Sequence, residues 1–300
     1  MKSGFIGIIG EPNVGKSSLM NRLIGEKISI VSPKPQTTRD AIRGILTTDE
    51  YQMIFIDTPG LLTPKTELGR YMSKETDSGV KDVDVLVIVI DGNKRLSDKN
   101  IALIEKKLKN NLTPTYLVIN KTDEAGFERI YPLLNRLNYL LTKDGDREAL
   151  KEIIPTSCKN GSNIDVLRNY LVSELKDDIM YYPEVYMTDR SLRFVCGEII
   201  REKALLFLQD EVPHGIGLII NKFEEKQSSV LVEADIVCEK ESHKRIIIGQ
   251  SGQMIKQIGE SARLAIMRKV EKNVYLNLFV KVRVGWRNKK NFLSDLGYEG

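Results

Sequence analysis

The stretch that decides the fold is Gly10-Glu11-Pro12-Asn13-Val14-Gly15-Lys16-Ser17, which follows an apolar segment at 5–9 and opens a segment with helical spacing at 17–23. It fits the pattern G-x-x-x-x-G-K-[ST] in the strand–loop–helix context that this pattern requires. In such a loop, successive backbone N–H groups surround phosphates, the lysine reaches the outer phosphates, and the serine hydroxyl binds magnesium. The stretch therefore predicts a nucleotide site at residues 10–17, extended by Ser18 in the first helical turn.

The segments around this loop alternate between strands and helices. Strands are expected at 5–9, 41–48, 51–57, 83–91, 115–120 and 153–157, and helices at 17–23, 99–108, 128–141 and 164–175. The segments 41–48 and 51–57 flank a short polar turn and are typical of a hairpin. The segment 83–91 is nearly continuous in Val, Ile and Leu, as in a strand buried on both faces. We expect residues 1–176 to form an α/β domain with a mostly parallel sheet and helices on both faces.

The choice of base is indicated by Asn120-Lys121-Thr122-Asp123, at the end of a buried strand. The Asp123 carboxylate can accept hydrogen bonds from N1–H and the exocyclic amine of guanine. Adenine offers no such pair of donors, so the acceptor would be left unpaired with it. Lys121 can lay its aliphatic stem along the base. These residues predict a guanine nucleotide.

Three further segments complete the expected site. In Asp57-Thr58-Pro59-Gly60, Asp57 can hold magnesium and the Gly60 N–H can sense the γ-phosphate. Thr156-Ser157-Cys158-Lys159 can present backbone N–H groups to the guanine carbonyl. The polar segment 34–40 contains Thr37 and Thr38, one of which can complete the magnesium shell when the γ-phosphate is bound. We favour Thr38 and leave Thr37 open, so the expected metal ligands are Ser17, Thr38 and Asp57.

A different pattern begins after Lys176. Residues 177–190 are expected to be a linker, and residues 191–300 a second domain with helix 192–208, strands 216–226 and 230–239, a short helix, a glycine-rich turn, helix 253–270 and strand 274–284. The turn contains G-x-x-G at residues 249–252. The residues expected to contact RNA are Lys244, Arg245, Ile248, Gly249, Gln250, Ser251, Gly252, Ile255 and Lys256.

Composition and charge are consistent with this division. The chain has 300 residues, of which 41% are hydrophobic and 29% charged, as in ordinary globular proteins. Residues 239–290 contain thirteen Lys or Arg and four Glu, a net charge of +9, which leaves −5 for the rest of a chain whose net charge is +4. A basic C-terminal third predicts an anionic partner.

The expected location follows from what the sequence lacks. The three cysteines, Cys158, Cys196 and Cys238, match no metal or disulfide spacing, which favours reduced thiols. The first residues are too briefly apolar for a signal peptide, and the longest apolar run, at 85–90, is far below membrane-spanning length. We expect a cytoplasmic monomer, with peripheral membrane contact left open.

Together, the five N-terminal segments resemble the translation-factor branch of small GTPases and, within it, the TrmE-Era-EngA-like subgroup. The block at 191–300, in the order α-β-β-α-α-β around G-x-x-G, resembles the type II KH domain of bacteria. The resemblance covers nearly the whole chain and implies an α/β P-loop GTPase domain followed by an α+β KH domain. It also implies a bacterial GTPase that binds the 3′ end of small-subunit (16S) ribosomal RNA and assists small-subunit assembly and maturation.

The resemblance implies that GTP, GDP and Mg²⁺ are bound, with slow hydrolysis. Ras-like GTPases have a water-orienting glutamine after Asp-x-x-Gly, where this chain has Leu61. Asn13 matches the loop asparagine that helps to hold K⁺ in potassium-dependent members. It can equally be a loop-capping side chain. The candidate catalytic groups are thus Asn13, Lys16 and Gly60.

Several alternatives remain open at this stage. Trp286, in the polar and basic tail 285–300, can stack on a base or pack on its own domain. The nucleotide can drive a switch, in which the loops at 34–40 and 57–66 order with GTP and shift the second domain, or it can be a structural ligand of a constitutive RNA-binding scaffold. A metabolic kinase or ATP-driven helicase is disfavoured by residues 120–123.

Overall fold

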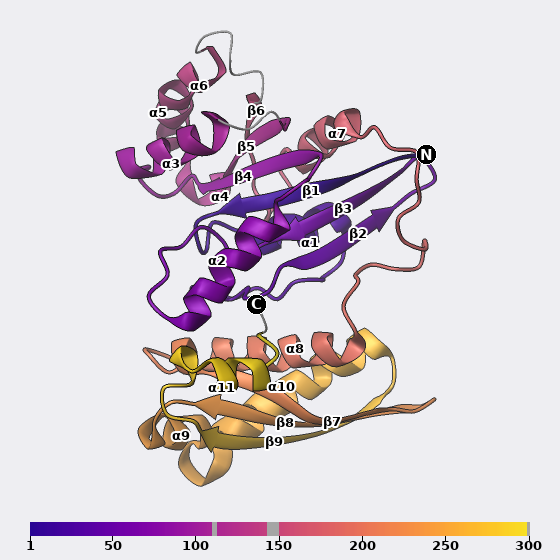
Figure 1. The fold of residues 1–300 in the computed structure, drawn as a ribbon, viewed down its shortest axis with the longest axis vertical. Coiled ribbons are helices and arrows are strands. Elements are labelled where there is room, and N and C mark those ends of the chain that lie inside the picture. The colour runs from indigo at the N-terminus through magenta and orange to yellow at the C-terminus, as the bar shows by residue number, and fades with distance from the viewer. Residues whose placement is uncertain (110–112, 143–149, 299–300) are drawn as a thin grey trace. The chain divides into compact units, whose positions relative to one another are not determined.

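The computed structural model describes residues 1–109, 113–142 and 150–298 (Figure 1). It consists of two compact units. The first comprises Met1–Ser29, Thr38–Leu62 and Ser73–Asp189, and the second comprises Ile30–Thr37, Thr63–Met72 and Arg190–Gly300. Within the described ranges, no helix is both long enough and apolar enough to cross a membrane.

The first unit is built on a six-stranded sheet with the order β2-β3-β1-β4-β5-β6. Its strands are β1 (Lys2–Gly10), β2 (Ile42–Thr47), β3 (Tyr51–Asp57), β4 (Val85–Asp91), β5 (Thr115–Asn120) and β6 (Leu150–Pro155). All neighbouring strands are parallel except β2, which pairs antiparallel with β3 and closes one edge. The predicted hairpin and mostly parallel sheet are confirmed.

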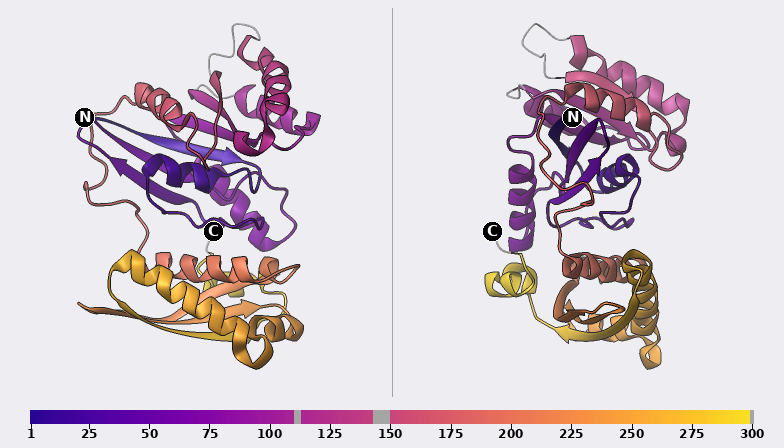
Figure 2. Two further views of the ribbon diagram at one scale, coloured as in Figure 1. Left: turned by 180° about the vertical axis from the view of Figure 1, so that it is seen from behind. Right: turned by 90° about the vertical axis from the view of Figure 1, so that its right-hand side faces the viewer.

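Helices cover both faces of this sheet (Figure 2). The helices are α1 (Lys16–Ile24), α2 (Glu67–Gly79), α3 (Asp98–Lys109), α4 (Thr122–Ala125), α5 (Phe127–Leu137), α6 (Tyr139–Thr142) and α7 (Ile164–Glu174). Alternate side chains of β5 show the two layers. Leu117 packs with residues of α3 and α5, whereas the next side chain back, Tyr116, contacts Tyr170 and donates to Glu174 Oε1 of α7. Because both faces are covered, β5 is buried at every position.

The helix predicted at 128–141 is divided in two. Asn138 separates α5 from α6, yet its backbone keeps right-handed helical dihedral angles. The Leu141 N–H donates to the Asn138 carbonyl over three residues, which is a tighter turn than an α-helix makes. The break is therefore a local tightening of one helical path.

The expected linker at 177–190 has regular contacts with the first unit. Gln52 and Tyr182 exchange two hydrogen bonds, of 2.8 Å from Gln52 Nε2 and 3.0 Å to Gln52 Oε1. The Ile45 N–H donates to the Met187 carbonyl at 2.9 Å, beside a bridge between Gly44 and Thr188. The contacts at Gly44 and Ile45 pair the segment with edge strand β2, which reduces the number of unsatisfied backbone groups on that strand.

The second unit has the predicted α-β-β-α-α-β order. It contains α8 (Leu192–Phe207), η1 (Pro213–Gly215), β7 (Gly217–Glu225), β8 (Ser229–Cys238), α9 (Glu241–Ile248), η2 (Gln250–Gly252), α10 (Gln253–Val270) and β9 (Asn273–Val282). β8 is central, antiparallel to β7 and parallel to β9. Side chains of α8 and α10, such as Ile200 and Ile266, pack on one face of β8.

The tail at 285–300 is polar and basic in composition, but it contains regular structure. It folds into η3 (Trp286–Asn288) and α11 (Lys290–Asp295), while residues 299–300 lie outside the described residues. Trp286 is fully buried, and its Nε1–H donates to the Gly215 carbonyl at 2.9 Å. Of the two alternatives for Trp286, packing on its own domain is confirmed and base stacking is wrong.

We predict that Trp286→Phe lowers the free energy of unfolding by about 1–3 kcal/mol, because it leaves the buried Gly215 carbonyl without a donor. Urea unfolding followed by far-ultraviolet circular dichroism measures the change. Tyr275→Phe is the control, since Tyr275 is 63% exposed and its change should stay within about 0.5 kcal/mol. Equal stabilities of the two variants would contradict the structural role of the indole N–H.

Candidate functional site

The phosphate loop lies where β1, the strand with β3 on one side and β4 on the other, ends and α1 begins. Ligands of open α/β sheets bind at the carboxyl ends of such strands. Gly15 has φ +100°, and a Cβ on it would lie 2.2 Å from Asn120 Nδ2. Only glycine therefore fits at this position. The Asn120 Nδ2–H donates to the Val14 carbonyl at 2.9 Å, and the Lys121 ammonium donates to the Asn13 carbonyl at 2.7 Å, so the end of β5 holds the loop.

Lys16 is buried inside the loop and 5% exposed. Its ammonium donates to the carbonyls of Gly10 at 3.3 Å and Glu11 at 3.0 Å. Burial lowers the pKa of Lys16 to about 8, against the opposing effect of the carboxylates of Asp57 and Glu11. Phosphate oxygens would favour the charged form of Lys16, as the sequence pattern requires.

The three predicted magnesium ligands converge. Ser17 Oγ lies 2.6 Å from Asp57 Oδ2 and 2.9 Å from Thr38 Oγ1. Asp57 is fully buried, and burial raises the pKa of its carboxyl group, opposed by Lys16 and by hydrogen bonds including those from Ser17 and Thr38. Asp57 Oδ1 is a buried acceptor with no hydrogen-bond partner among the described residues. Two hydroxyls and one carboxylate with a spare oxygen fit a hard cation such as Mg²⁺.

The structure separates the two threonines. Thr38 Oγ1 faces Ser17 and Asp57, as described above, whereas Thr37 Oγ1 donates to the Lys34 carbonyl at 2.6 Å and lies 2.7 Å from Ser32 Oγ. Thr37 thus stabilises its own turn, and the geometry favours Thr38 as the ligand. No group of three or more His, Cys, Asp or Glu side chains that could hold a metal occurs in the described part of the chain.

The segment after β3 closes over the loop. Thr58 Oγ1 donates to the Ile8 carbonyl at 2.9 Å, and the buried Pro59 follows it. Gly60 has φ +105°, and a Cβ there would lie 2.6 Å from Lys16 Nζ. The Leu61 N–H donates to the Gly10 carbonyl at 2.9 Å. Gly60 is therefore close enough to the phosphate lysine for its N–H to sense a γ-phosphate, while the adjacent Leu61 side chain has no polar atom to orient water.

The base-binding residues form a connected group. Asp123 Oδ1 accepts from Ser157 Oγ at 2.5 Å, and Asp123 Oδ2 lies 3.8 Å from Lys159 Nζ. Asn120 Oδ1 accepts from the Cys158 N–H at 3.2 Å. Burial raises the pKa of the Cys158 thiol to about 12, so this cysteine stays protonated beside the base site.

One member of this group was missed from the sequence. Asp91, at the end of β4, accepts from Lys121 Nζ at 2.7 Å and has a side chain only 4% exposed. It orients the lysine whose stem is expected to lie along the base. The sequence shows only a carboxylate that closes a wholly apolar strand, and the register that places Asp91 opposite Asn120 of β5 is visible only in the structure.

The predicted RNA contacts surround the turn between α9 and α10. Gly249 has φ +74°, and a Cβ there would lie 2.7 Å from Met254 Cβ, so a side chain does not fit. Gly252 has φ +80°, and a Cβ on it would meet no atom within 4 Å, which leaves its outer side open to a nucleic-acid backbone. Gln250 and Ser251 are exposed at the tip of the turn.

Basic and apolar side chains flank this turn. Arg245 and Lys256 are exposed and Lys244 is half-buried, while Ile248 and Ile255 are both half-buried. Ile246 is 50% exposed and was not among the predicted contacts. Its position in a run of three isoleucines concealed it, because only the helix geometry distinguishes the buried Ile247 from its exposed neighbour.

Comparison with known proteins places both parts in described families. The family model described as 50S ribosome-binding GTPase matches residues 5–121, and the family model of the KH domain matches residues 211–287. GTPase Era of Clostridium botulinum (strain Alaska E43 / Type E3) is 44% identical over 299 residues, covering 99% of each chain. GTPase Era of Clostridium kluyveri is 45% identical over 300 residues, covering 100% of both.

Two solved structures are similar over the whole chain, each 34% identical and covering 100% of both chains. One is Era in complex with MgGDPNP and nucleotides 1506–1542 of 16S ribosomal RNA, with a TM-score of 0.92. The other is a singly substituted variant of Aquifex aeolicus Era bound to GDP.AlF4⁻, with a TM-score of 0.93. The predicted fold class and the resemblance to Era-like GTPases are confirmed.

We predict that Asp123→Asn weakens GTP binding about 100- to 1,000-fold, because one of the two acceptor oxygens for the guanine donors is replaced by an N–H donor that faces them. Fluorescent GTP titration measures the affinity. Glu124→Gln is the matched control, since it removes a neighbouring exposed carboxylate that is not in the base group. A similar loss in both variants would rule out a specific role for Asp123.

Proposed function

Because this chain belongs to the Era family of GTPases, we propose that it is a GTP-hydrolysing switch protein that binds single-stranded RNA at the 3′ end of 16S ribosomal RNA and assists assembly and maturation of the small ribosomal subunit. The observation that carries the RNA part is the open G-x-x-G turn at residues 249–252, flanked by Arg245 and Lys256. A side chain at Gly252 would meet no protein atom, so this backbone is accessible to a phosphate chain.

The hydrolytic site acts mainly by positioning and charge. Ser17, Thr38 and Asp57 would hold Mg²⁺, which neutralises charge on the β- and γ-phosphates. Lys16 contacts the outer phosphates, and the Gly60 N–H donates to the γ-phosphate. Leu61 leaves the attacking water without a side-chain partner at this position, which is consistent with a slow intrinsic rate.

A monovalent cation can supply part of the missing charge. Asn13 has φ +66° in the phosphate loop, and its carbonyl is held by Lys121 at 2.7 Å, so its side chain is placed on a fixed backbone. We propose that Asn13 helps to hold K⁺ beside the phosphates, where the cation stabilises developing negative charge.

In the wild-type chain, GTP turnover in KCl should be about tenfold or more faster than in NaCl, which corresponds to about 1.36 kcal/mol in the barrier. Asn13→Ala is expected to reduce this ratio to about one, because the variant lacks the side chain proposed to hold K⁺. Steady-state phosphate release in the two salts measures it, with GTP affinity as the control. If affinity falls and the ratio of rates is unchanged, Asn13 is a loop-capping residue and the cation proposal fails.

The RNA proposal is tested by adding negative charge to the turn. Gln250→Asp/Ser251→Asp should weaken binding of an RNA with the 3′-end sequence of 16S ribosomal RNA at least about tenfold at about 150 mM salt, because carboxylates repel phosphates. Ser251 has φ +49°, a conformation that Asp tolerates. Gln227→Asp/Ser228→Asp is the matched control, because the same exposed dipeptide occurs there in the β7–β8 turn.

The same titrations separate a switch from a constitutive scaffold. As a switch, the wild-type chain binds the RNA more tightly with a non-hydrolysable GTP analogue than with GDP. Equal affinities in the two states, together with no GTP turnover with or without RNA, would favour the scaffold.

We further propose that the protein acts in the cytoplasm as a monomer and that any membrane contact is peripheral. Three free cysteines, two of them buried, support a reducing compartment.

A further inference from the structure

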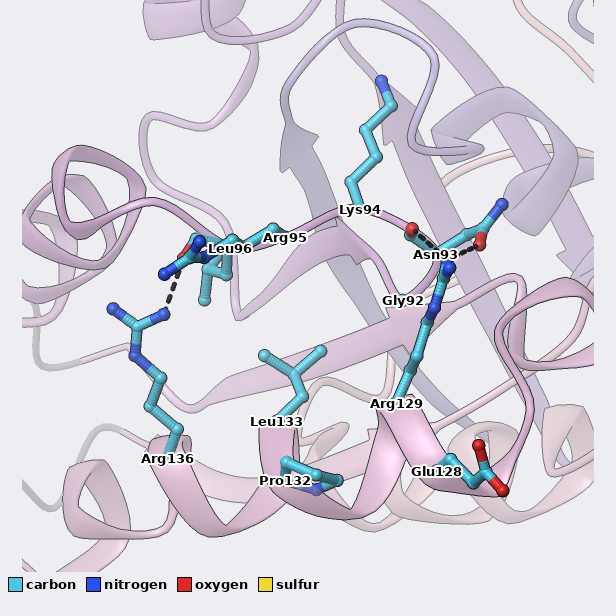
Figure 3. A pocket seen from close by; sticks show the side chains of 10 residues that line it. All are labelled: Gly92, Asn93, Lys94, Arg95, Leu96, Glu128, Arg129, Pro132, Leu133 and Arg136. Atoms are coloured by element: carbon cyan, nitrogen blue, oxygen red, sulfur yellow. Dashed lines mark hydrogen bonds between the residues drawn. The ribbon is translucent and has the colours of Figure 1, made fainter.

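The first unit contains a pocket of about 480 Å³ between the loop that follows β4 and one face of α5 (Figure 3). Its lining includes four basic side chains, Lys94, Arg95, Arg129 and Arg136, and one carboxylate, Glu128. The volume is within the range of small-ligand sites. The net charge of the lining makes an anion the expected ligand.

Two elements contribute the basic side chains. Arg129 and Arg136 are seven residues apart on α5, which places them on one face of the helix about two turns from each other. Pro132 and Leu133 lie between them and form an apolar floor (Figure 3). Lys94 and Arg95 belong to the loop and are both exposed.

The helix arginines hold the loop in place. Arg129 Nη1 donates to the Asn93 carbonyl at 3.1 Å and to Asn93 Oδ1 at 2.6 Å, and Arg136 Nη1 donates to the Leu96 carbonyl at 2.7 Å. Arg136 also pairs with Asp98. By contrast, no carboxylate of the described residues lies within ion-pair distance of Lys94 or Arg95. These two cations are therefore the ones available to a ligand.

The combination of floor and cations selects the ligand. A nucleotide has a flat base that can lie on Pro132 and Leu133 or on a guanidinium plane, and a phosphate that attracts Lys94 and Arg95. An acidic peptide supplies the charge but no flat body for the apolar floor. We propose that this pocket binds a nucleotide of single-stranded RNA, as a contact separate from the turn at 249–252. The choice of RNA as ligand rests on the proposed function.

The pocket is connected to the base-binding group through its loop. The Gly92 N–H donates to the Asn120 carbonyl at 2.8 Å, and a Cβ on Gly92 would lie 2.8 Å from Ile130 Cδ1 of α5. The preceding residue, Asp91, pairs with Lys121 at 2.7 Å. The pocket loop thus begins at the residue that orients Lys121, the lysine expected to lie along the guanine base, which gives a route for mutual effects on affinity.

The test uses the full chain with the turn disabled by Gln250→Asp/Ser251→Asp, and a fluorescein-labelled RNA of about 20 nucleotides and mixed sequence as the probe. Lys94→Ala/Arg95→Ala is added in this background. The control is Lys81→Ala/Lys151→Ala. It removes two exposed lysines that lie near the amino ends of β4 and β6, whereas the pocket loop follows the carboxyl end of β4. Affinities are measured from about 50 to 200 mM KCl, and crosslinking with 4-thiouridine RNA locates the contact.

The turn-disabled chain should retain weak binding. Lys94→Ala/Arg95→Ala should reduce the slope of log K against log salt by about 0.7, which is the contribution of the one phosphate of single-stranded RNA that the two side chains contact. The Lys81→Ala/Lys151→Ala slope should be unchanged, and crosslinks should fall in residues 92–96 and 128–136.

Equal slope changes in the two variants, or no residual binding, would overturn the pocket proposal. A third result would also overturn it. If Lys94→Ala/Arg95→Ala abolished binding of a labelled polyglutamate peptide and left RNA binding unaffected, the pocket would be assigned to an acidic protein. None of these results would affect the proposed function, because the proposed function is tested separately with chains that retain an intact turn.

Discussion

The nucleotide site depends on the side chain of Asn120. Its amide nitrogen donates to the Val14 carbonyl of the phosphate loop, and its oxygen accepts from the Cys158 N–H. One buried amide at the end of β5 therefore joins three segments that are far apart in sequence. The close approach explains why residue 15 is glycine, since any Cβ there would overlap the amide. A displaced Asn120 would separate the phosphate site from the base site, and neither half alone is selective for GTP.

The parts of this arrangement that could be predicted from the sequence are those marked by short, contiguous sequence motifs. The phosphate loop, Asp57 and residues 120–123 are short patterns at strand ends, and a parallel sheet brings its strand ends together. Their grouping could thus be predicted before any coordinates. Asp91 could not, because its role depends on the register of β4 against β5, which places it beside Asn120 and within reach of Lys121.

The second unit shows the same limit. Its element order was predictable from periodicity and the glycine turn. The tail is polar and basic in composition, and its sequence left open whether Trp286 stacks on a base or packs on its own domain. In the structure Trp286 is fully buried and donates to Gly215, 71 residues away. The indole is buried while the charged groups of Lys289 and Lys290 stay in water, so a polar composition did not oppose the burial of this one large side chain. Likewise, the exposure of Ile246 depends on which face of α9 packs inward, which a run of three isoleucines does not reveal.

Burial acts in opposite directions on the two charged groups that meet the phosphates. It lowers the pKa of Lys16 and raises that of Asp57, so each is pushed toward its neutral form although they partly stabilise one another. A phosphate beside Lys16 and a divalent cation beside Asp57 each favour the charged form. Because the ligands favour both charged forms, their binding stabilises the conformation of the segments that hold them. Thr38 shares the Asp57 oxygen and lies at the edge of a segment whose next residue back, Thr37, is bonded within its own turn. We therefore expect loss of the γ-phosphate to alter the backbone conformation first at the bond between Thr37 and Thr38.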